Sequence, residues 1–390
     1  MSDHAQHRRR RSPYATRAGR GLLLATVLLA LGTVAGLVVL WPGDGPRTGP
    51  GTAMGGPTRA ATVTAVDTVD CGGPQPQDCV QVAVRLPSAE RARMLLGPAG
   101  AVQAPAVGET VRVHRTGASG ADAYAYAGID RRRTLLLVAC AFAVMVIVLA
   151  RMRGLLALAG LGLSLVLVTQ FLLPAILAGS SALAVALVGS LAVMFVTVVL
   201  TYGITPPSLA ACLGIAGSLL LAALAGLAVV DAAQLDGRTG ELSAYLATAG
   251  GGISLQGVVL AGLVIGVLGV LADMGVTQAS TVMALRRANP RLGTRGLFLG
   301  AFGVGRDHLV ATTHTLVLAY LGASLPLLLG LGAAGVTTTD ALNSQEVAEP
   351  IVATLIGAMA LLVSVPLTTA LCAVMVQRMP PEALPEGHAH

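Results

Sequence analysis

The chain has 390 residues, of which 54% are hydrophobic and only 11% are charged, and its mean hydropathy is +0.76. This composition excludes an ordinary soluble domain, and the 3% aromatic content disfavours an aromatic-girdled outer-membrane barrel. The net charge of +6 comes from arginine, since the sequence has no lysine; these arginines lie beside apolar runs without interleaved aromatic residues, which disfavours nucleic-acid binding.

Eight apolar stretches approach the length of about 20 residues that a helix needs to cross a hydrocarbon core roughly 30 Å thick. They span residues 21–41, 134–150, 154–173, 181–201, 208–230, 253–272, 296–331 and 350–376. The first is too long for the apolar region of a signal peptide, and no small-x-small cleavage site follows it closely, so we expect a retained anchor. These stretches predict an α-helical polytopic membrane protein of about eight transmembrane helices, with the lipid bilayer as its surroundings.

The arginines predict an orientation for these spans. Six of them lie at positions 8–20, before the first span, and others fall in the turn at 151–153, the loop at 286–295 and the tail at Arg378. Cytoplasmic loops carry an excess of arginine, so we expect both termini in the cytoplasm and the protein in the inner, or cytoplasmic, membrane of the cell. The three arginines at 131–133 alone run against this rule.

Residues 59–130 follow a different pattern from the spans. Stretches such as ATVTAVD and VQVAVRL alternate apolar and polar residues with turn residues between them, which is typical of half-buried strands. We therefore expect a small extracytoplasmic β-barrel-like domain between the first and second spans. Before it we expect a cytoplasmic arginine-rich tail (1–20), the anchor (21–41) and a Gly/Pro linker (42–58). After it we expect a seven-helix membrane domain (131–378) and a second cytoplasmic tail (379–390).

Two cysteines of this domain flank a Gly/Pro/Gln loop between two strand-like runs, in a segment that we place outside the cytoplasm. Oxidation is permitted there. We expect a disulfide between Cys71 and Cys79.

Small and polar residues follow one face of the predicted sixth span and its continuation. Spacings of three and four place them together on a helix; they are Gly262, Gly266, Gly269, Asp273, Thr277 and Ser280. Two interpretations are open: a close-packing seam with Asp273 at the cytoplasmic edge, or a polar path through the membrane.

The stretch 296–331 is far longer than one crossing requires, so we expect it to tilt strongly or to break near its glycines at 296–305. A helix from Arg306 onward has one polar or small face, with two further polar residues along its edge. The face carries His308, Thr312 and Thr315, and the edge carries Asp307 and His314. These side chains either line a path or bond to neighbouring backbone, and we expect Arg306 to lie close to Asp273 because the two spans are antiparallel neighbours.

Motifs of catalysis and metal binding are absent from the sequence. It has no H-x-x-x-H or H-E-x-x-H pair, no G-x-S-x-G elbow and no P-loop, which would require lysine. We expect no enzymatic activity, no cofactor and no metal site.

The stretch ADMGVTQAS at 272–280, with GRDHLVATTHTLVLAYLGASLPLLL at 305–329, resembles the YibE/F-like family of bacterial multi-pass membrane proteins. The GETVRV strand and the DRRR motif at 130–133 also look like that family, so the resemblance covers residues 60–376. It implies placement in a membrane, with activity unassigned and the name permease sometimes applied. The family commonly has asparagine at the position of His314, so a proton-relay role of this residue would not be a feature of the family as a whole.

Two functions are compatible with these patterns. The first is a permease or channel-like carrier for a small solute or ion, with a path along the polar faces of the sixth and seventh spans. The second is a non-transporting envelope protein, whose β domain binds an envelope partner or whose helices form a homo-oligomer. Flux through purified protein in liposomes would separate them.

Overall fold

The computed structural model describes residues 17–43, 58–71, 77–116, 123–239 and 253–378. The expected C-terminal tail, most of the N-terminal tail and most of the Gly/Pro linker lie outside these residues. The chain forms two compact units, one of residues 48–151 and the other of residues 1–47 and 152–390. The smaller unit therefore holds the β domain and the first part of the helix that follows it, up to residue 151.

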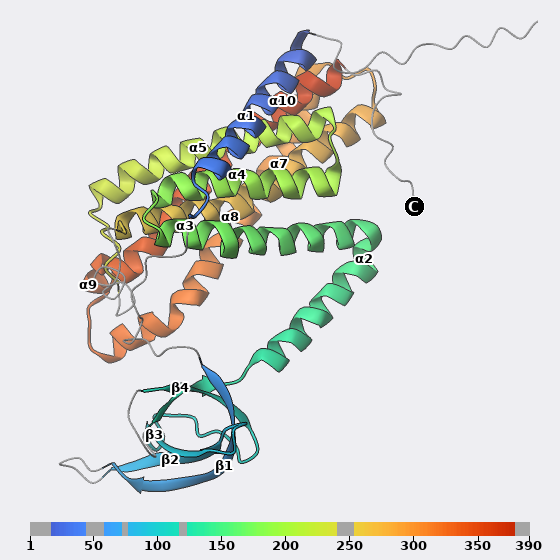
Figure 1. The fold of residues 1–390 in the computed structure, drawn as a ribbon. Coiled ribbons are helices and arrows are strands. Elements are labelled where there is room, and N and C mark those ends of the chain that lie inside the picture. The colour runs from blue at the N-terminus through green and yellow to red at the C-terminus, as the bar shows by residue number, and fades with distance from the viewer. Residues whose placement is uncertain (1–16, 44–57, 72–76, 117–122, 240–252, 379–390) are drawn as a thin grey trace, which may run out of the picture. The chain divides into compact units, whose positions relative to one another are not determined.

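The β domain is a five-stranded antiparallel sheet that curls into a half-barrel (Figure 1). Its strands are β1 (Arg59–Asp70), β2 (Asp78–Arg85), β3 (Arg91–Pro98), β4 (Thr110–Arg115) and β5 (Tyr124–Ile129), in the order β3-β2-β1-β4-β5. The edge strands β3 and β5 approach each other. Alternate residues, such as Val82, Val84, Val111 and Val113, fill the buried side, as the period of two in the sequence predicts.

A disulfide and a side-chain hydrogen bond connect separate segments of the β domain. A disulfide joins Cys71 to Cys79, the pair expected from the sequence, and so ties the end of β1 to the start of β2. The hydroxyl of Tyr124 donates a hydrogen bond of 2.9 Å to the carboxylate of Glu90. That bond raises the pKa of Tyr124, because the carboxylate favours the protonated phenol.

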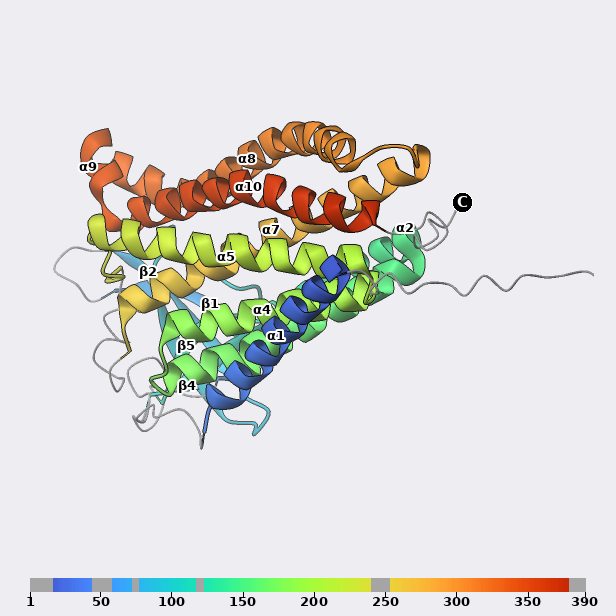
Figure 2. The ribbon, with the colours of Figure 1, turned by 90° about the horizontal axis from the view of Figure 1, so that it is seen from above.

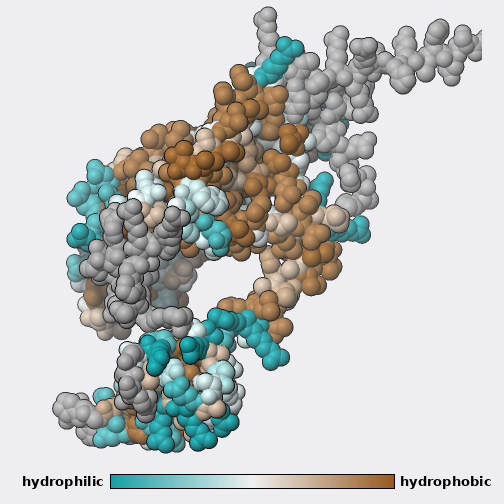
Figure 3. Space-filling view, in the orientation of Figure 1, coloured by the Kyte–Doolittle hydropathy of each residue, from teal (hydrophilic) through white to brown (hydrophobic). Residues whose placement is uncertain are grey.

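The larger unit is a helical bundle. Its long helices are α1 (Arg17–Val39), α4 (Ala182–Tyr202), α5 (Pro206–Ala232), α7 (Leu255–Ala288), α8 (Thr294–Ala333) and α10 (Gln345–Gln377), with the short α9 (Thr338–Asn343) before α10. The helix α2 (Arg132–Leu167) begins in the other unit and continues through a π-helical turn (Val168–Leu172) into α3 (Leu173–Leu177). Figure 3 shows a largely hydrophobic surface over the helices and a more hydrophilic one over the β domain.

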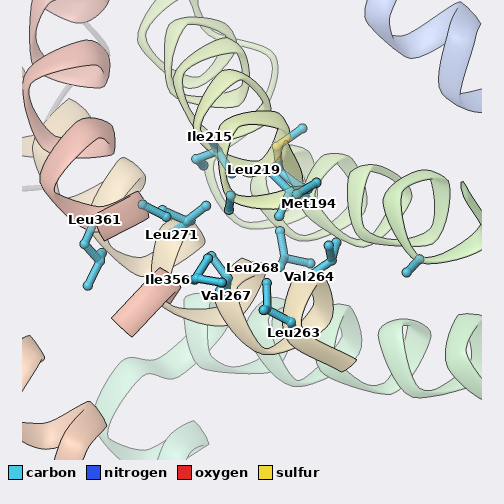
Figure 4. Close-up of a cluster of buried hydrophobic side chains, with 14 of the residues drawn as sticks. Met194, Ile215, Leu219, Leu263, Val264, Val267, Leu268, Leu271, Ile356 and Leu361 are labelled. Atoms are coloured by element: carbon cyan, nitrogen blue, oxygen red, sulfur yellow. The ribbon is translucent and has the colours of Figure 1, made fainter. Parts of the chain in front are cut away.

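The helices α5, α7 and α10 pack side by side at the centre of the bundle, as Figure 2 shows. The core between them and α4 is aliphatic and includes Met194, Ile215, Leu271 and Leu361 (Figure 4). A second cluster joins Leu22 and Leu209 near the starts of α1 and α5 to Val282 and Val376 near the ends of α7 and α10. The helices α1 and α5 therefore run in one direction, and α7 and α10 run in the other.

Seven helices in the described residues are long and apolar enough to cross a membrane. One of them, Arg132–Leu177, contains both the second and the third predicted stretches. At Arg151 its backbone leaves the helical region (φ 50°, ψ −129°), at the position where the sequence predicts a turn. A length of 46 residues corresponds to about 69 Å of helix, enough for two crossings.

The expected break in the stretch 296–331 is wrong. The helix α8 is continuous from Thr294 to Ala333, with no break at its glycines. The reason is that Gly300 and Gly305 lie close to side chains of α7, so glycine serves close helix packing there. The helix α7 continues for 15 residues beyond Asp273, so this carboxylate lies in the interior of the helix.

Candidate functional site

Asp273 on α7 meets His308 on α8. The Oδ2 atom of Asp273 lies 3.7 Å from Nε2 of His308, and the side chains are 68% and 42% exposed. This distance is longer than a hydrogen bond, so the contact is an ion pair only when the imidazole is protonated. The expected partner Arg306 forms none of the ion pairs found in the described part of the chain. Residues two apart on a helix point about 200° apart, so His308 and Arg306 cannot both face α7.

The threonines of α8 bond within their own helix. The hydroxyls of Thr312 and Thr315 donate to carbonyls four residues earlier, at 2.9 and 3.1 Å. Asp307, His314 and Thr315 are exposed on the surface of this unit. Of the expected path on these two helices, the structure therefore brings together Asp273 and His308.

The glycine stripe of α7 is not a uniform packing seam. A Cβ at Gly266 would lie 3.1 Å from the hydroxyl of Tyr320 on α8, whereas Gly262 and Gly269 have no neighbouring atom within 4 Å of that position. The closest helix approaches occur at other glycines. A Cβ at Gly214 would overlap the side chain of Thr368, and one at Gly305 would overlap that of Gln278.

Gln278 is the most deeply buried amide of the bundle core, with no exposed surface. Its Oε1 accepts a hydrogen bond of 2.9 Å from the hydroxyl of Thr369 on α10. Its Nε2 is buried and has no hydrogen-bond partner within the described ranges. An unpartnered buried donor typically costs about 1–3 kcal/mol, so this amide lowers the stability of the fold.

Other fully buried polar side chains lie on α5 and α10. The hydroxyl of Ser218 donates to the carbonyl of Gly214 at 2.9 Å. The hydroxyl oxygens of Ser364 and Thr368 are buried without a hydrogen-bond partner in the part of the chain that is described. These residues and the Gln278–Thr369 pair form what we call the polar seam: Ser218, Gln278, Ser364, Thr368 and Thr369, each with no exposed surface.

Two cavities lie toward opposite ends of α5. The arginine cavity, of about 240 Å³, is bounded by α4, α5 and α7 and lined by Arg153 and Arg287 together with the hydroxyl-bearing Thr201, Tyr202, Thr205, Ser208 and Ser280. The glutamate cavity, of about 430 Å³, is bounded by α5, α7, α8 and α10 and includes Val230, Gly262, Tyr320 and Glu349. From Ser208 to Val230 is about 33 Å along α5, close to the thickness of a hydrocarbon core.

The described residues contain no group of three or more His, Cys, Asp or Glu side chains arranged to hold a metal ion. The polar chemistry of the bundle is instead that of amides, hydroxyls and single charges. Such groups can take over hydrogen bonds from a partly dehydrated solute or ion.

A family model described as YibE/F-like protein matches residues 138–378. The chain belongs to the YibE/F-like family. The match includes the polar seam and the helices that line both cavities, and it leaves out the β domain and α1. No curated protein and no solved structure matches the chain.

Sequence reasoning missed all five residues of the polar seam of this YibE/F-like protein. It considered the polar residues near Asp273 and Arg306, whereas the fully buried amide and hydroxyls are Gln278 and residues of α5 and α10. A signal was present: Gln278 lies in the same ADMGVTQAS stretch as Asp273, and Thr368 and Thr369 interrupt an apolar run. Without the packing of α10 against α7, nothing in that stretch distinguishes a buried glutamine from an exposed one.

Proposed function

We propose that this YibE/F-like protein is a permease or channel-like carrier for a small solute or ion in the cell membrane, and that the polar seam forms the narrow part of its path. The carrying observation is the burial of Gln278, Ser364 and Thr368 with unpartnered polar atoms. Gln278 lies on α7, which lines both cavities, and Ser364 and Thr368 lie on α10, which lines the glutamate cavity. Polar groups deep in a membrane bundle are costly, and in transporters they bind cargo near the midplane.

The α7–α8 contact has a supporting role in this proposal. Asp273 and Thr277 precede Gln278 on α7, and His308 follows Gly305, which packs against Gln278. A change in the Asp273–His308 contact would therefore be transmitted to the seam through the close approach of α7 and α8. On this proposal, the other polar residues of α8 lie on the side of the path that faces away from the polar seam. They are Arg306, Asp307, Thr312, His314 and Thr315.

The proposal includes eight membrane crossings with both termini in the cytoplasm and the β domain outside. The non-helical Arg151 supports two crossings in Arg132–Leu177, and the arginines at 151–153 and 286–295 support the orientation. A cysteine at Gly100 should react with an impermeant thiol reagent in intact cells, and one at Arg291 should not. The reverse labelling pattern would refute the orientation, and Cys71 and Cys79 should react only after reduction.

The transport proposal is tested with Gln278→Leu in proteoliposomes, using gradients of sodium, potassium, chloride, phosphate and protons as probes. Leucine has nearly the same size and removes an unpartnered donor, so we expect thermal stability within about 1 kcal/mol of the wild type. Flux should nevertheless fall strongly. Gln170→Leu is the matched control, because Gln170 is exposed and should leave flux unchanged. Undiminished flux through Gln278→Leu would remove the seam from the path.

One observation favours the second candidate, a non-transporting envelope protein. The β domain lies in a compact unit with only the first part of α2 and carries a disulfide, as expected of a domain that binds a partner outside the cytoplasm. Absence of flux for every probe, together with a stable complex of the full chain with an envelope protein or with itself, would favour this function. We propose no catalytic activity for either candidate.

A further inference from the structure

The arginine cavity has a chemical character that the transport proposal does not use. Its polar lining consists of two guanidinium groups and five hydroxyl groups, and none of the described residues that line it is acidic. Arginine presents a planar array of N–H donors that matches the oxygens of a phosphate, and hydroxyls add further donors. A lining rich in donors and positive charge is complementary to an oxyanion.

The start of α5 adds positive potential to this cavity but no backbone donors. Thr205 caps the helix, and Pro206 and Pro207 have no N–H group. The next two backbone N–H groups are already bonded, that of Ser208 to Thr205 Oγ1 and that of Leu209 to the carbonyl of Thr205. The helix dipole therefore favours an anion there, while the hydrogen bonds to it must come from side chains.

Thr201 supplies an independent indication of a ligand. Thr201 is one of the residues that line the cavity, and its Oγ1 atom is buried and has no hydrogen-bond partner in the described residues. Thr205 and Ser208 already share a hydrogen bond of 2.7 Å between their hydroxyls, which leaves one of the two protons available. The donors on hand exceed the four acceptor positions of a carboxylate and suit a tetrahedral oxyanion.

We propose that the arginine cavity is a binding site for a phosphate group, held by Arg153 and Arg287 with hydroxyl donors from Thr201, Tyr202 and Ser280. A cavity of about 240 Å³ accommodates inorganic phosphate or the phosphate of a lipid headgroup entering from the bilayer edge. The site goes beyond the proposed transport, because it can be occupied whether or not the phosphate group is carried.

The test measures binding directly, without flux. Inorganic phosphate is titrated into purified full-length protein in detergent by calorimetry, with sodium chloride at matched ionic strength as the control. We expect Arg153→Gln and Arg287→Gln each to weaken binding roughly tenfold or more, since each removes charge-assisted hydrogen bonds. Arg295→Gln is the matched control: Arg295 is exposed near the start of α8, makes the same charge change and does not line the cavity.

Two further variants separate binding from folding and from transport. Thr201→Val should keep or raise thermal stability, because it removes an unpartnered hydroxyl, yet weaken phosphate binding roughly threefold to tenfold. Asp273→Asn removes a carboxylate about 10 Å along α7 from Ser280, so it should keep or tighten phosphate binding while flux falls. Loss of flux with intact phosphate binding would thus show that Asp273 acts in transport and not in phosphate binding.

A lipid source is distinguished by native mass spectrometry after reconstitution with phosphatidic acid or with diacylglycerol, which lacks the phosphate. Arginine-dependent retention of phosphatidic acid without binding of inorganic phosphate would support the site with a lipid ligand. The proposal is overturned if the double variant Arg153→Gln/Arg287→Gln binds both probes as the wild type does, or if wild type binds neither.

Discussion

The helices α10 and α8 differ in how their polarity relates to burial. The helix α10 has no charged residue after Glu349 and buries fourteen of its 33 residues, among them Ser364, Thr368 and Thr369. The helix α8 carries Arg306, Asp307 and His308 in its interior, but buries only three of its 40 residues, all in its first third. Charge therefore marks the edge of this bundle, and uncharged polar residues among small ones mark its centre.

The largest effect is expected where α5 meets α10. A side chain at Gly214 would overlap Thr368, including its backbone, so Gly214→Leu should cost about 3 kcal/mol or more and prevent recovery of folded protein. Gly322→Leu on α8 is the matched control, because no atom lies within 4 Å of the added Cβ. Size-exclusion profiles in detergent compare the two, and similar losses would contradict the distinction between centre and edge.

A moderate effect is expected where α8 approaches α7. Gly305→Ala places a methyl group against Gln278 and should destabilise the protein by about 1–3 kcal/mol. Gly303→Ala, two residues away with no neighbouring atom, should be neutral or stabilising by up to about 1 kcal/mol.

Rescue sharpens this comparison. Adding Gln278→Ala to Gly305→Ala removes the side chain that the methyl group meets, so the double variant should be less destabilised than the sum of the singles. Thermal unfolding in one detergent compares the stability of the wild type, the two single variants and the double variant. If the destabilisations of the two single variants simply add in the double variant, then α8 can move away from α7 at little cost in free energy.

The smallest effect is expected at the α7–α8 ion pair. Because Asp273 and His308 are 3.7 Å apart and substantially exposed, a double-mutant cycle with alanine should give a coupling energy under about 1 kcal/mol. The same cycle with Arg306→Ala in place of His308→Ala should give no coupling. A coupling above about 2 kcal/mol in the first cycle would indicate a pair that is desolvated in the assembled protein.

The sequence predicted the helices well where hydropathy alone sets their limits. The stretches 181–201 and 208–230 lie within one or two residues of α4 and inside α5. It failed at the end of α7, which continues to Ala288, and at the start of α10, which begins at Gln345, because hydropathy measures the apolar core and not the helix that continues into polar surroundings. Glycines are ambiguous in the same way, since those of α8 fit a helix break as well as the close approach that the structure contains.

The candidate site was predictable only in part, for a related reason. Asp273 and His308 are visible as charges in apolar surroundings, and the structure brings them together. Gln278 and Arg153 become notable only through their neighbours, namely Thr369 for one and the arginine cavity for the other. Burial and cavity lining depend on the packing of helices that are far apart in sequence, which no local pattern contains.

The single non-helical residue Arg151 has a consequence for the biosynthesis of this protein. On the proposed topology, only a short turn around Arg151 separates the two apolar runs. We therefore expect them to insert into the bilayer together, as a helical hairpin. The insertion of this hairpin determines the direction in which every later helix crosses the membrane. Loss of one run would require export of the arginine-rich loop at 286–295, which the positive-inside rule opposes.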